Sequence, residues 1–377
     1  MAAGLNFSPH FLFVVATLTI AANGYLGDRS PPTVKGAYWP SWTTTTFPPS
    51  AINTSLFTHI FYAFLAPSNI SHKFEISDST AVSLSNFTST LRYADPPAKT
   101  LFSVGGGGDD TNYARIAFEP SSRRVFIRSS IEVARKFGFD GVDLDWEFPK
   151  SPKEMKYLGL LLKEWRHAIK REAQLTSRPP LLITAAVYFS VDFFLGDNRS
   201  FPVAAIRENL DWINIMSYDY HGAWANITGP NAALFDPTSN INTIYGLKSW
   251  IRAGMPTDKI VMGLPLYGRT WQLEDPNVNG IGAKAVGPGP GNGSLSYNVV
   301  DRLIENGSTV VYHVDTVSVY TVVGSSWIAF DNALTITTKI GFAQALGLRG
   351  YFFWALSFDK EWEISTQASR SWVLDNK

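Results

Sequence analysis

Short apolar runs recur along the chain and alternate with segments whose apolar residues follow a helical period. Helical periodicity is clearest at 122–138, 152–173 and 241–254. The apolar runs are rich in aliphatic and aromatic residues, so we predict strands at 34–40, 59–65, 100–106, 141–147, 181–189, 212–219, 260–268 and 350–356. Such alternation is typical of parallel strands buried on both faces. Eight strands close a (β/α)8 TIM barrel, and an open doubly wound sheet is the alternative.

The longest gap between predicted strands separates the seventh from the eighth. Residues 278–294 form a Gly/Pro-rich stretch without periodicity, which predicts a loop. Residues 308–330 alternate like antiparallel strands joined by a Gly-Ser-Ser turn. A chain of 377 residues is long enough for one barrel with an insertion. We therefore predict a barrel formed by 25–269 and 332–377, with a small inserted α+β lobe at 270–331.

The first residues have the features of a secretion signal. An apolar run at 11–24 ends in small residues and precedes a polar segment, so 1–24 is predicted to be a signal peptide and the protein to be secreted. Roughly 12 apolar residues are too few to span a bilayer, and no second long run follows, so no membrane association is expected. Seven glycosylation sequons in the chain after the predicted signal agree with export: Asn53, Asn69, Asn86, Asn198, Asn226, Asn292 and Asn306.

Composition narrows the range of partners. Lys+Arg and Asp+Glu are both 32, so the chain has no overall basic charge that would favour nucleic acid or a membrane surface. Aromatic residues make up 14% of the chain, which fits either a ligand recognised by flat rings or an aromatic-rich core. Cysteine is absent, which excludes thiol nucleophiles and Cys-type zinc sites. We expect a monomer.

The stretch DGVDLDWEFP, residues 140–149, carries three acids spaced two apart: Asp143, Asp145 and Glu147. Side chains alternate across a strand, so the three carboxyl groups should share one face, which in a parallel barrel is the interior. Glu147 comes last, at the C-terminal mouth where such barrels place their chemistry. Carboxyl groups this close raise one another's pKa and share protons. This arrangement favours acid/base chemistry with a protonated Glu147 above a buried Asp.

Three other interpretations of these acids are a calcium loop, a magnesium site and a solvated acidic strand end. A local calcium loop starting at Asp143 would need Gly at its sixth position, which is Phe148. A magnesium site on the strand, or a solvated acidic strand end, remains as an alternative. The glycines of SVGGGGDD at 103–110 lack the Lys-Ser/Thr of a phosphate loop, and the histidines show no metal-ligand spacing. We predict neither a metal nor a cofactor.

With these residues the chain resembles the family 18 glycoside hydrolases, and among them the plant class V chitinases. DGVDLDWE matches the family's DGxDxDxE signature, and KGAYWPSW, SVGG at 103–106, MSYD at 216–219 and Trp354 follow in the family's order. The likeness covers nearly all of the chain after the predicted signal. It implies a (β/α)8 barrel with an inserted lobe. It also implies retaining, endo-acting hydrolysis of chitin or chitooligosaccharides in the apoplast or vacuole.

The resemblance also implies a role for each acid. Glu147 would protonate the glycosidic oxygen and later activate water, while the substrate's own acetamido oxygen attacks the anomeric carbon. Asp145 would hold the acetamido N–H and offset positive charge, and Asp143 would take up or release the shared proton. Tyr218 would donate its hydroxyl to the acetamido oxygen.

Aromatic and small residues at the strand ends are the predicted substrate contacts: Trp354 as a floor under the sugar, with Tyr38, Phe64, Gly105, Gly106, Met216, Asp219 and Tyr220. Further tryptophans near strand ends are candidates for stacking on sugars: Trp39, Trp42, Trp146, Trp224 and Trp271. The remaining ones singled out are expected to pack in the core: Trp165, Trp250 and Trp372.

Two stretches depart from the family pattern and leave substrate preference open. Phe330-Asp331-Asn332 stands where the family commonly has Tyr-Asp-Asp, and 354–362 is a segment that varies among related enzymes. Both are predicted to border the outer part of the binding cleft. Hydrolysis of lipo-chitooligosaccharide signals is therefore one alternative. A chitin-binding lectin on the same scaffold is another, although such lectins usually lack the catalytic Glu.

Overall fold

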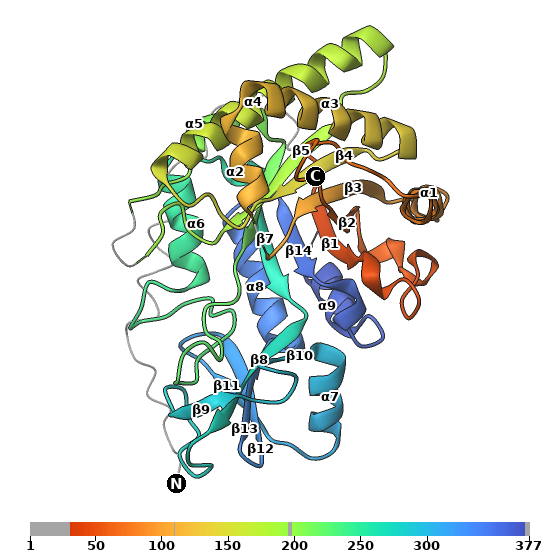
Figure 1. Ribbon diagram of the computed structural model, residues 1–377. Coiled ribbons are helices and arrows are strands. Elements are labelled where there is room, and N and C mark those ends of the chain that lie inside the picture. Colours follow the sequence, from red (N-terminus) through yellow and green to blue (C-terminus); the bar gives the residue numbers. More distant parts are fainter. Residues whose placement is uncertain (1–30, 109, 195–197, 374–377) are drawn as a thin grey trace. The chain divides into compact units, whose positions relative to one another are not determined.

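The protein is described by a computed structural model at residues 31–108, 110–194 and 198–373. The predicted signal peptide, 1–24, lies outside these residues. Within them, eight parallel strands close a barrel in the order β1-β14-β7-β6-β5-β4-β3-β2 (Figure 1). The strands are β1 Val34–Pro40, β2 His59–Leu65, β3 Lys99–Gly105, β4 Gly141–Asp145, β5 Leu182–Tyr188, β6 Trp212–Met216, β7 Ile260–Pro265 and β14 Gly350–Trp354. The predicted (β/α)8 barrel is confirmed, and closure excludes the open sheet.

Helices surround the barrel (Figure 1). They are α1 Asp78–Arg92, α2 Thr111–Phe118, α3 Pro120–Phe137, α4 Pro152–Thr176, α5 Val203–Asn209, α6 Thr243–Arg252, α8 Ala333–Ala345 and α9 Glu363–Ser371. The sequence sets the start of α4, because the Ser151 side chain accepts a hydrogen bond from the Glu154 N–H and Pro152 fits the first turn. Among the described residues, no helix combines the length and apolar character needed to span a membrane.

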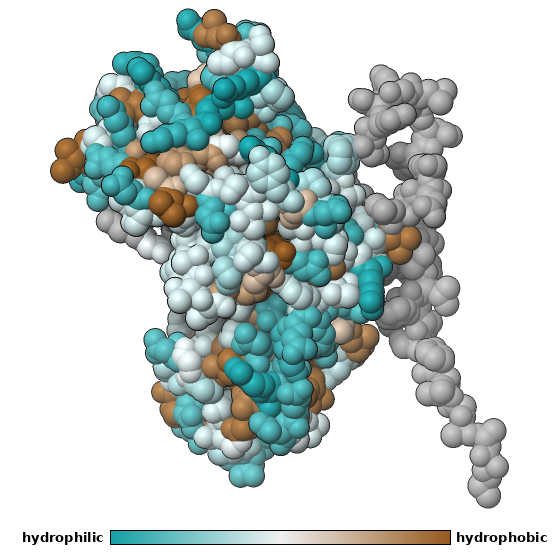
Figure 2. Space-filling model, turned by 90° about the vertical axis from the view of Figure 1, so that its right-hand side faces the viewer, coloured by the Kyte–Doolittle hydropathy of each residue, from teal (hydrophilic) through white to brown (hydrophobic). Residues whose placement is uncertain are grey.

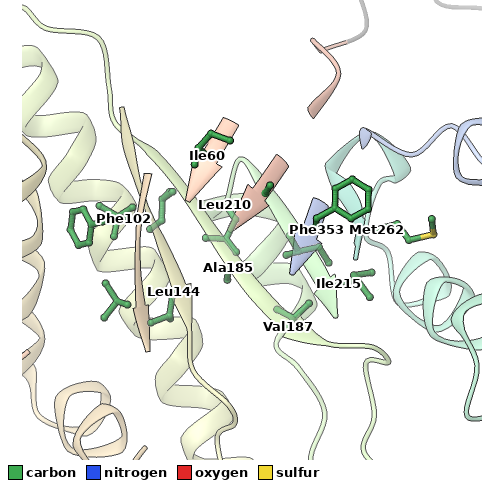
Figure 3. Packing of buried hydrophobic residues seen from close by; sticks show 14 of the residues in the cluster. Ile60, Phe102, Leu144, Ala185, Val187, Leu210, Ile215, Met262 and Phe353 are labelled. Carbon is green, nitrogen blue, oxygen red and sulfur yellow. The ribbon is translucent and has the colours of Figure 1, made fainter. Parts of the chain in front are cut away.

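In the barrel, apolar side chains form two separate layers. One lies between strands and helices and includes Ile60, Phe102, Leu144, Ile215 and Phe353 (Figure 3). The other fills the barrel interior and includes Phe61, Leu101, Trp212, Val261 and Phe352. Because side chains alternate along β4, Val142 and Leu144 enter the outer layer while Asp143 and Asp145 face inward. On the surface shown in Figure 2, hydrophobic side chains are scattered among hydrophilic ones.

A second, antiparallel sheet is formed by residues between β7 and β14. In the described chain its strands run β10-β8-β13-β12-β11, with β9 beside β8, and it lies next to one end of β7 (Figure 1). Its elements are β8 Tyr267–Leu273, β9 Ala285–Pro288, β10 Ser294–Ser296, α7 Tyr297–Glu305, β11 Val310–His313, β12 Ser318–Val323 and β13 Ser326–Phe330. The predicted Gly-Ser-Ser turn joins β12 to β13, because Val323 pairs with Ser326.

Three predicted boundaries are wrong. The pattern predicts a seventh strand through residue 268, but β7 ends at Pro265, which has no N–H for further pairing, and the chain passes into β8 of the second sheet. The predicted loop at 278–294 contains β9, which pairs with β8. Finally, β4 ends at Asp145, so Glu147 lies two residues beyond the strand.

Candidate active site

A buried hydrogen-bond network surrounds Asp143 inside the barrel. Its Oδ2 accepts hydrogen bonds from the Tyr38 hydroxyl at 2.8 Å and the Ser103 hydroxyl at 2.7 Å. Its Oδ1 accepts from the Thr184 hydroxyl at 2.6 Å and from Asn214 Nδ2 at 3.4 Å. Burial raises the pKa of Asp143, while the bonds from Thr184, Ser103 and Tyr38 oppose that rise. The network therefore holds this carboxyl group in one orientation.

Asp145 and Glu147 lie above Asp143 and line a cavity. Asp145 Oδ1 is buried and has no hydrogen-bond partner among the described residues. Burial, followed by the charges of Glu147 and Asp143, raises the pKa of Asp145 well above its usual range. Burial, followed by the charge of Asp219, raises the pKa of Glu147 to about 7. At neutral pH these carboxyl groups share protons, and Glu147 can both donate and accept one.

The cavity has a volume of about 1020 Å³ and lies at the C-terminal ends of the barrel strands. This is the upper end of the range for pockets that hold a drug-sized ligand, so it has room for more than one sugar ring. Its lining combines the two acids with many aromatic residues: Trp42, Phe64, Phe148, Tyr188, Phe189, Phe194, Tyr218, Tyr220, Trp224, Tyr267 and Trp354. The site suits an uncharged ligand whose flat apolar faces stack on the aromatic rings. The two acids could then protonate or deprotonate the ligand at the bond that is cleaved.

Three aromatic rings from the ends of β1, β2 and β14 form one wall of the cavity. Phe64 stacks on Trp354 with ring centroids 5.6 Å apart, and Trp42 stacks on Phe64 at 6.3 Å. Trp42 remains 62% exposed, so its face is open to a ligand. Stacked aromatic faces of this kind suit the apolar faces of sugar rings.

Gly105 and Gly106 line the cavity. At these two residues the backbone passes very close to Asp145 at the end of β4. Both have positive φ, 122° and 90°. A Cβ on Gly105 would lie 1.9 Å from the Asp145 carbonyl oxygen, and one on Gly106 would lie 2.7 Å from the Phe64 ring. The Gly106 N–H donates to the same carbonyl oxygen at 2.9 Å. Glycine is thus needed to hold the turn beside Asp145.

Tyr218 and Asp219 follow the end of β6 and line the same cavity as the Gly turn. Burial and the charges of Asp145, Asp219, Glu147 and Asp143 raise the pKa of Tyr218 well above its usual range, so its hydroxyl stays protonated and can donate. Asp219 accepts hydrogen bonds from the Tyr267 hydroxyl and from Arg269 Nε, both at 2.7 Å.

Comparison with known proteins identifies this arrangement. The profile described as Glycosyl hydrolases family 18 matches residues 35–359. The chain belongs to glycosyl hydrolase family 18. It is 54% identical to class V chitinase CHIT5b of Medicago truncatula over 346 residues, covering 90% of this chain and 91% of that protein. It is also 54% identical to Nod factor hydrolase protein 1 of the same plant, with 90% of each chain covered.

A solved structure agrees with the family assignment. The GH18 chitinase of Cycas revoluta in complex with (GlcNAc)3 superposes with a TM-score of 0.87 at 39% identity, covering 90% of this chain and all of that one. The resemblance to plant class V chitinases seen in the sequence is thereby confirmed, and the protein is a glycosidase of this family.

Most predicted site residues of this family 18 glycosidase come together at one cavity. Asp145, Glu147 and Tyr218 line it, as do the predicted contacts Trp354, Phe64, Gly105, Gly106, Met216, Asp219 and Tyr220. The hydroxyl of Tyr220 is engaged with Thr243 at 3.1 Å. The prediction for Tyr38 is wrong: it is absent from the described residues that line the cavity, because it lies one layer deeper and bonds to Asp143.

The tryptophans predicted to stack on sugars fall into two groups, those that line the cavity and those that are buried. Trp42 and Trp224 are exposed and line the cavity. Three others predicted near strand ends are buried instead, Trp39 and Trp146 between strands and helices and Trp271 in the second sheet. The three predicted to pack do so: Trp165, Trp250 and Trp372.

The Phe330-Asp331-Asn332 turn does not border the cleft as predicted. Asp331 and Lys339 are both buried and form an ion pair at 2.6 Å. Asn332 caps the N-terminus of α8, accepting hydrogen bonds from the Leu334 and Thr335 N–H groups. All three residues of the turn are outside the described cavity lining. The turn therefore acts in packing and helix capping.

Two sets of site residues are not found from the sequence motif. One set is the partners of Asp143 other than Tyr38, namely Ser103, Thr184 and Asn214. Asn214 could have been found, because it is a polar residue at an inward position of a strand, between Trp212 and Met216. The other is a set of aromatic and apolar residues that line the cavity with Glu147: Phe148, Tyr188, Phe189, Phe194 and Ile241. In the described part of the chain, no group of three or more His, Asp or Glu side chains is arranged to hold a metal ion.

Proposed function

We propose that the protein is a retaining, endo-acting chitinase that cleaves β-1,4-linked N-acetylglucosamine oligomers and polymers by substrate-assisted catalysis. The observation that carries this is Glu147, whose pKa is raised to about 7, placed in the cavity wall with Asp145 and Tyr218. The aromatic wall supplies faces on which sugar rings can stack. The resemblance to chitinases bound to (GlcNAc)3 supports the choice of substrate.

In the first step Glu147 donates its proton to the glycosidic oxygen. The bond from that oxygen to the anomeric carbon breaks as the substrate's acetamido oxygen bonds to the same carbon, giving an oxazolinium ion. Asp145 has one buried carboxylate oxygen without a partner among the described residues, and this oxygen accepts the acetamido N–H and offsets the positive charge. Tyr218 donates its hydroxyl to the acetamido oxygen and holds it at the anomeric carbon.

In the second step the Glu147 carboxylate removes a proton from water. The water oxygen bonds to the anomeric carbon, the oxazolinium ring opens, and the acetamido group is restored. Two displacements at the same carbon retain its configuration. Asp143 assists by taking up or releasing the proton shared with Asp145, and its four donors keep the carboxyl group in place while they favour its ionised form.

The test is a time course on chitin oligomers of defined length, with product lengths and anomers measured. Retained β-anomers from internal cleavage are expected. Glu147→Gln should bind oligomers normally but cleave them roughly 10²–10⁴-fold more slowly, because an amide cannot donate the proton. Full activity of that variant would refute the assignment. Binding by the wild-type protein without cleavage would instead support a lectin.

A second candidate substrate is the lipo-chitooligosaccharide class. The wall formed by Phe148, Phe189, Phe194 and Ile241 is apolar and lines the same cavity as Glu147, which suits an acyl chain attached to the sugar. The relative named Nod factor hydrolase protein 1 supports this possibility. Ile241→Asn should lower kcat/KM on an acylated tetramer about fivefold and leave the plain tetramer unchanged, since it removes roughly 1 kcal/mol of apolar contact. Equal effects on both substrates would argue against an acyl site.

Export completes the proposal: we propose a secreted glycoprotein of the apoplast or vacuole. All seven acceptor asparagines lie at exposed positions, which supports glycan attachment: Asn53, Asn69, Asn86, Asn198, Asn226, Asn292 and Asn306. The check is expression in a secreting eukaryotic cell, followed by mass spectrometry of the mature N-terminus and of each sequon. Retention inside the cell with the first 24 residues still attached would contradict the proposal.

A further inference from the structure

Asn231 is a buried asparagine whose side chain joins two segments of the active site. It is 2% exposed and lies in the buried stretch 228–234, between β6 and α6. Its Oδ1 accepts a hydrogen bond from the Asp219 N–H at 3.1 Å, and its Nδ2 donates to the Tyr267 carbonyl oxygen at 3.1 Å. Its own carbonyl oxygen accepts from the Tyr220 N–H at 3.0 Å.

Asn231 stabilises an unfavourable backbone conformation at Asp219. Asp219 has φ of +60°, in the left-handed region that non-glycine residues seldom occupy. Asn231 satisfies the N–H of this residue and at the same time fixes the main chain of Tyr267. The Tyr267 hydroxyl and Arg269 Nε in turn hold the Asp219 carboxylate, each at 2.7 Å. One amide therefore aligns the two segments that form this contact.

The segment that carries Asn231 is itself anchored. Lys339 Nζ on α8 donates to the carbonyl oxygen of Ala232 at 2.5 Å and pairs with Asp331 at 2.6 Å, all in the interior. Leu234 N–H donates to the Thr316 carbonyl oxygen at 2.9 Å. Asn231 thus sits on a fixed support between the barrel and the second sheet.

Asp219 matters because its charge acts on Glu147. The charged and titratable groups around the two residues are Asp145, Tyr218, Tyr267 and Arg269. If Asp219 moved away, Glu147 would lose a nearby like charge and would give up its proton at lower pH.

We propose that Asn231 is a positioning residue that holds the Asp219 carboxylate at the distance from Glu147 which the reaction requires. The inference rests on the proposed function only in taking Glu147 as the acid. It assigns a reaction role to a residue outside the acidic motif and connects the second sheet to the acid through one side chain.

The test compares Asn231→Ala with Asn242→Ala. Asn242 is a matched control, since it is 3% exposed and its side chain also makes two bonds, accepting from the Tyr245 N–H and donating to the Ser239 carbonyl oxygen. Both variants should lose thermal stability. Asn231→Ala alone should lower kcat on a chromogenic chitooligosaccharide, on the order of 10- to 100-fold. It alone should also move the basic limb of the pH profile to lower pH by roughly half a unit, the size expected for a partly exposed like-charged pair.

A double-mutant cycle shows whether the effect passes through Asp219. In an Asp219→Asn background, Asn231→Ala should move the basic limb no further. An equal movement in both backgrounds, an unmoved limb in Asn231→Ala, or an equal movement in Asn242→Ala would each overturn the proposal. If Asn231→Ala does not fold, Asn231→Ser keeps a hydroxyl for one buried partner and should move the limb in the same direction by less.

A substrate-free measurement separates this proposal from the proposed function. Carboxyl-carbon NMR titration of Glu147 in the wild-type and Asn231→Ala proteins should show the lower pKa in the variant. A wild-type protein that fails to cleave chitooligosaccharides would refute the proposed function, and the titration would still decide the role of Asn231. Identical titrations would refute the positioning role even in an active chitinase.

Discussion

Replacing Glu147 by Gln should stabilise the folded protein at neutral and alkaline pH while removing most of its activity. Burial and Asp219 raise the pKa of Glu147 from 4.5 to about 7. At about 1.36 kcal/mol per pKa unit, the ionised carboxylate destabilises the fold by on the order of 3 kcal/mol. Gln keeps the shape of the side chain but carries no charge, so this cost is absent. With Glu147 neutral, Asp145 also loses a like charge and adds to the gain.

The direction of the pH dependence follows from proton binding. The folded protein binds the Glu147 proton more tightly than the unfolded chain does, since the pKa is raised on folding. This contribution to stability is fully present below the unfolded pKa of 4.5 and is lost as the pH rises through about 7. The variant should therefore match the wild-type protein near pH 4, exceed it increasingly between these values, and reach a constant advantage above them.

Urea denaturation at several pH values measures this difference directly. The control is Glu132→Gln, because Glu132 is exposed and its one ion pair among the described residues is with Arg128, one helical turn away. That change should alter the free energy of unfolding by less than about 1 kcal/mol, without growth as the pH rises. A Glu147→Gln advantage that is constant from acid to alkaline pH, or absent above pH 7, would refute the reasoning.

Three further predictions follow from the same geometry. kcat/KM on a chromogenic chitooligosaccharide should fall above about pH 7 as Glu147 loses its proton, and a profile that stays flat to pH 9 would contradict its role as acid. Tyr38→Phe should lower the free energy of unfolding by about 1.5–3 kcal/mol, since it removes a bond to the carboxyl group of Asp143, whereas Tyr62→Phe, which loses a neutral bond to a serine, should cost about 1 kcal/mol in the same urea titration. Trp42→Ala should weaken binding of long oligomers by about 1 kcal/mol in calorimetry and leave the shortest ones unaffected, because its exposed face lies at the cavity rim; an equal loss for every length would place it elsewhere.

The alternation of side chains was enough to predict the fold class and the direction of the acids. Asp143 and Asp145 face the interior because Val142 and Leu144 are apolar and pack outward. Alternation predicts which face of a strand a side chain occupies, but it does not predict how far along the barrel axis that side chain lies from the cavity. Tyr38 illustrates this limit, since it points inward as expected but lies below the cavity.

The sequence pattern could not predict contacts between segments that are distant in the chain. Nearness to a strand end did not separate Trp42, which faces the cavity, from Trp39, which is buried, because the direction of the side chain depends on the neighbouring strands. Asn231 lies in a segment without periodicity, and its role depends on Asp219 and Tyr267, which are 12 and 36 residues away in the chain. Only tertiary structure brings such residues together.

The pairing of β3, β4 and β5 limits which insertions and deletions the sequence of this enzyme can accept during evolution. Ser103, Asp143 and Thr184 stand at one level because of strand register. Inserting or deleting a single residue between Gly141 and Asp143 would turn the Asp143 and Asp145 side chains toward the helical layer and would separate Asp143 from its donors. We therefore expect length variation in the loops beyond the Gly105-Gly106 turn, Glu147 and Asp219, so that new substrate preferences arise at the rim while the central strands keep a fixed length.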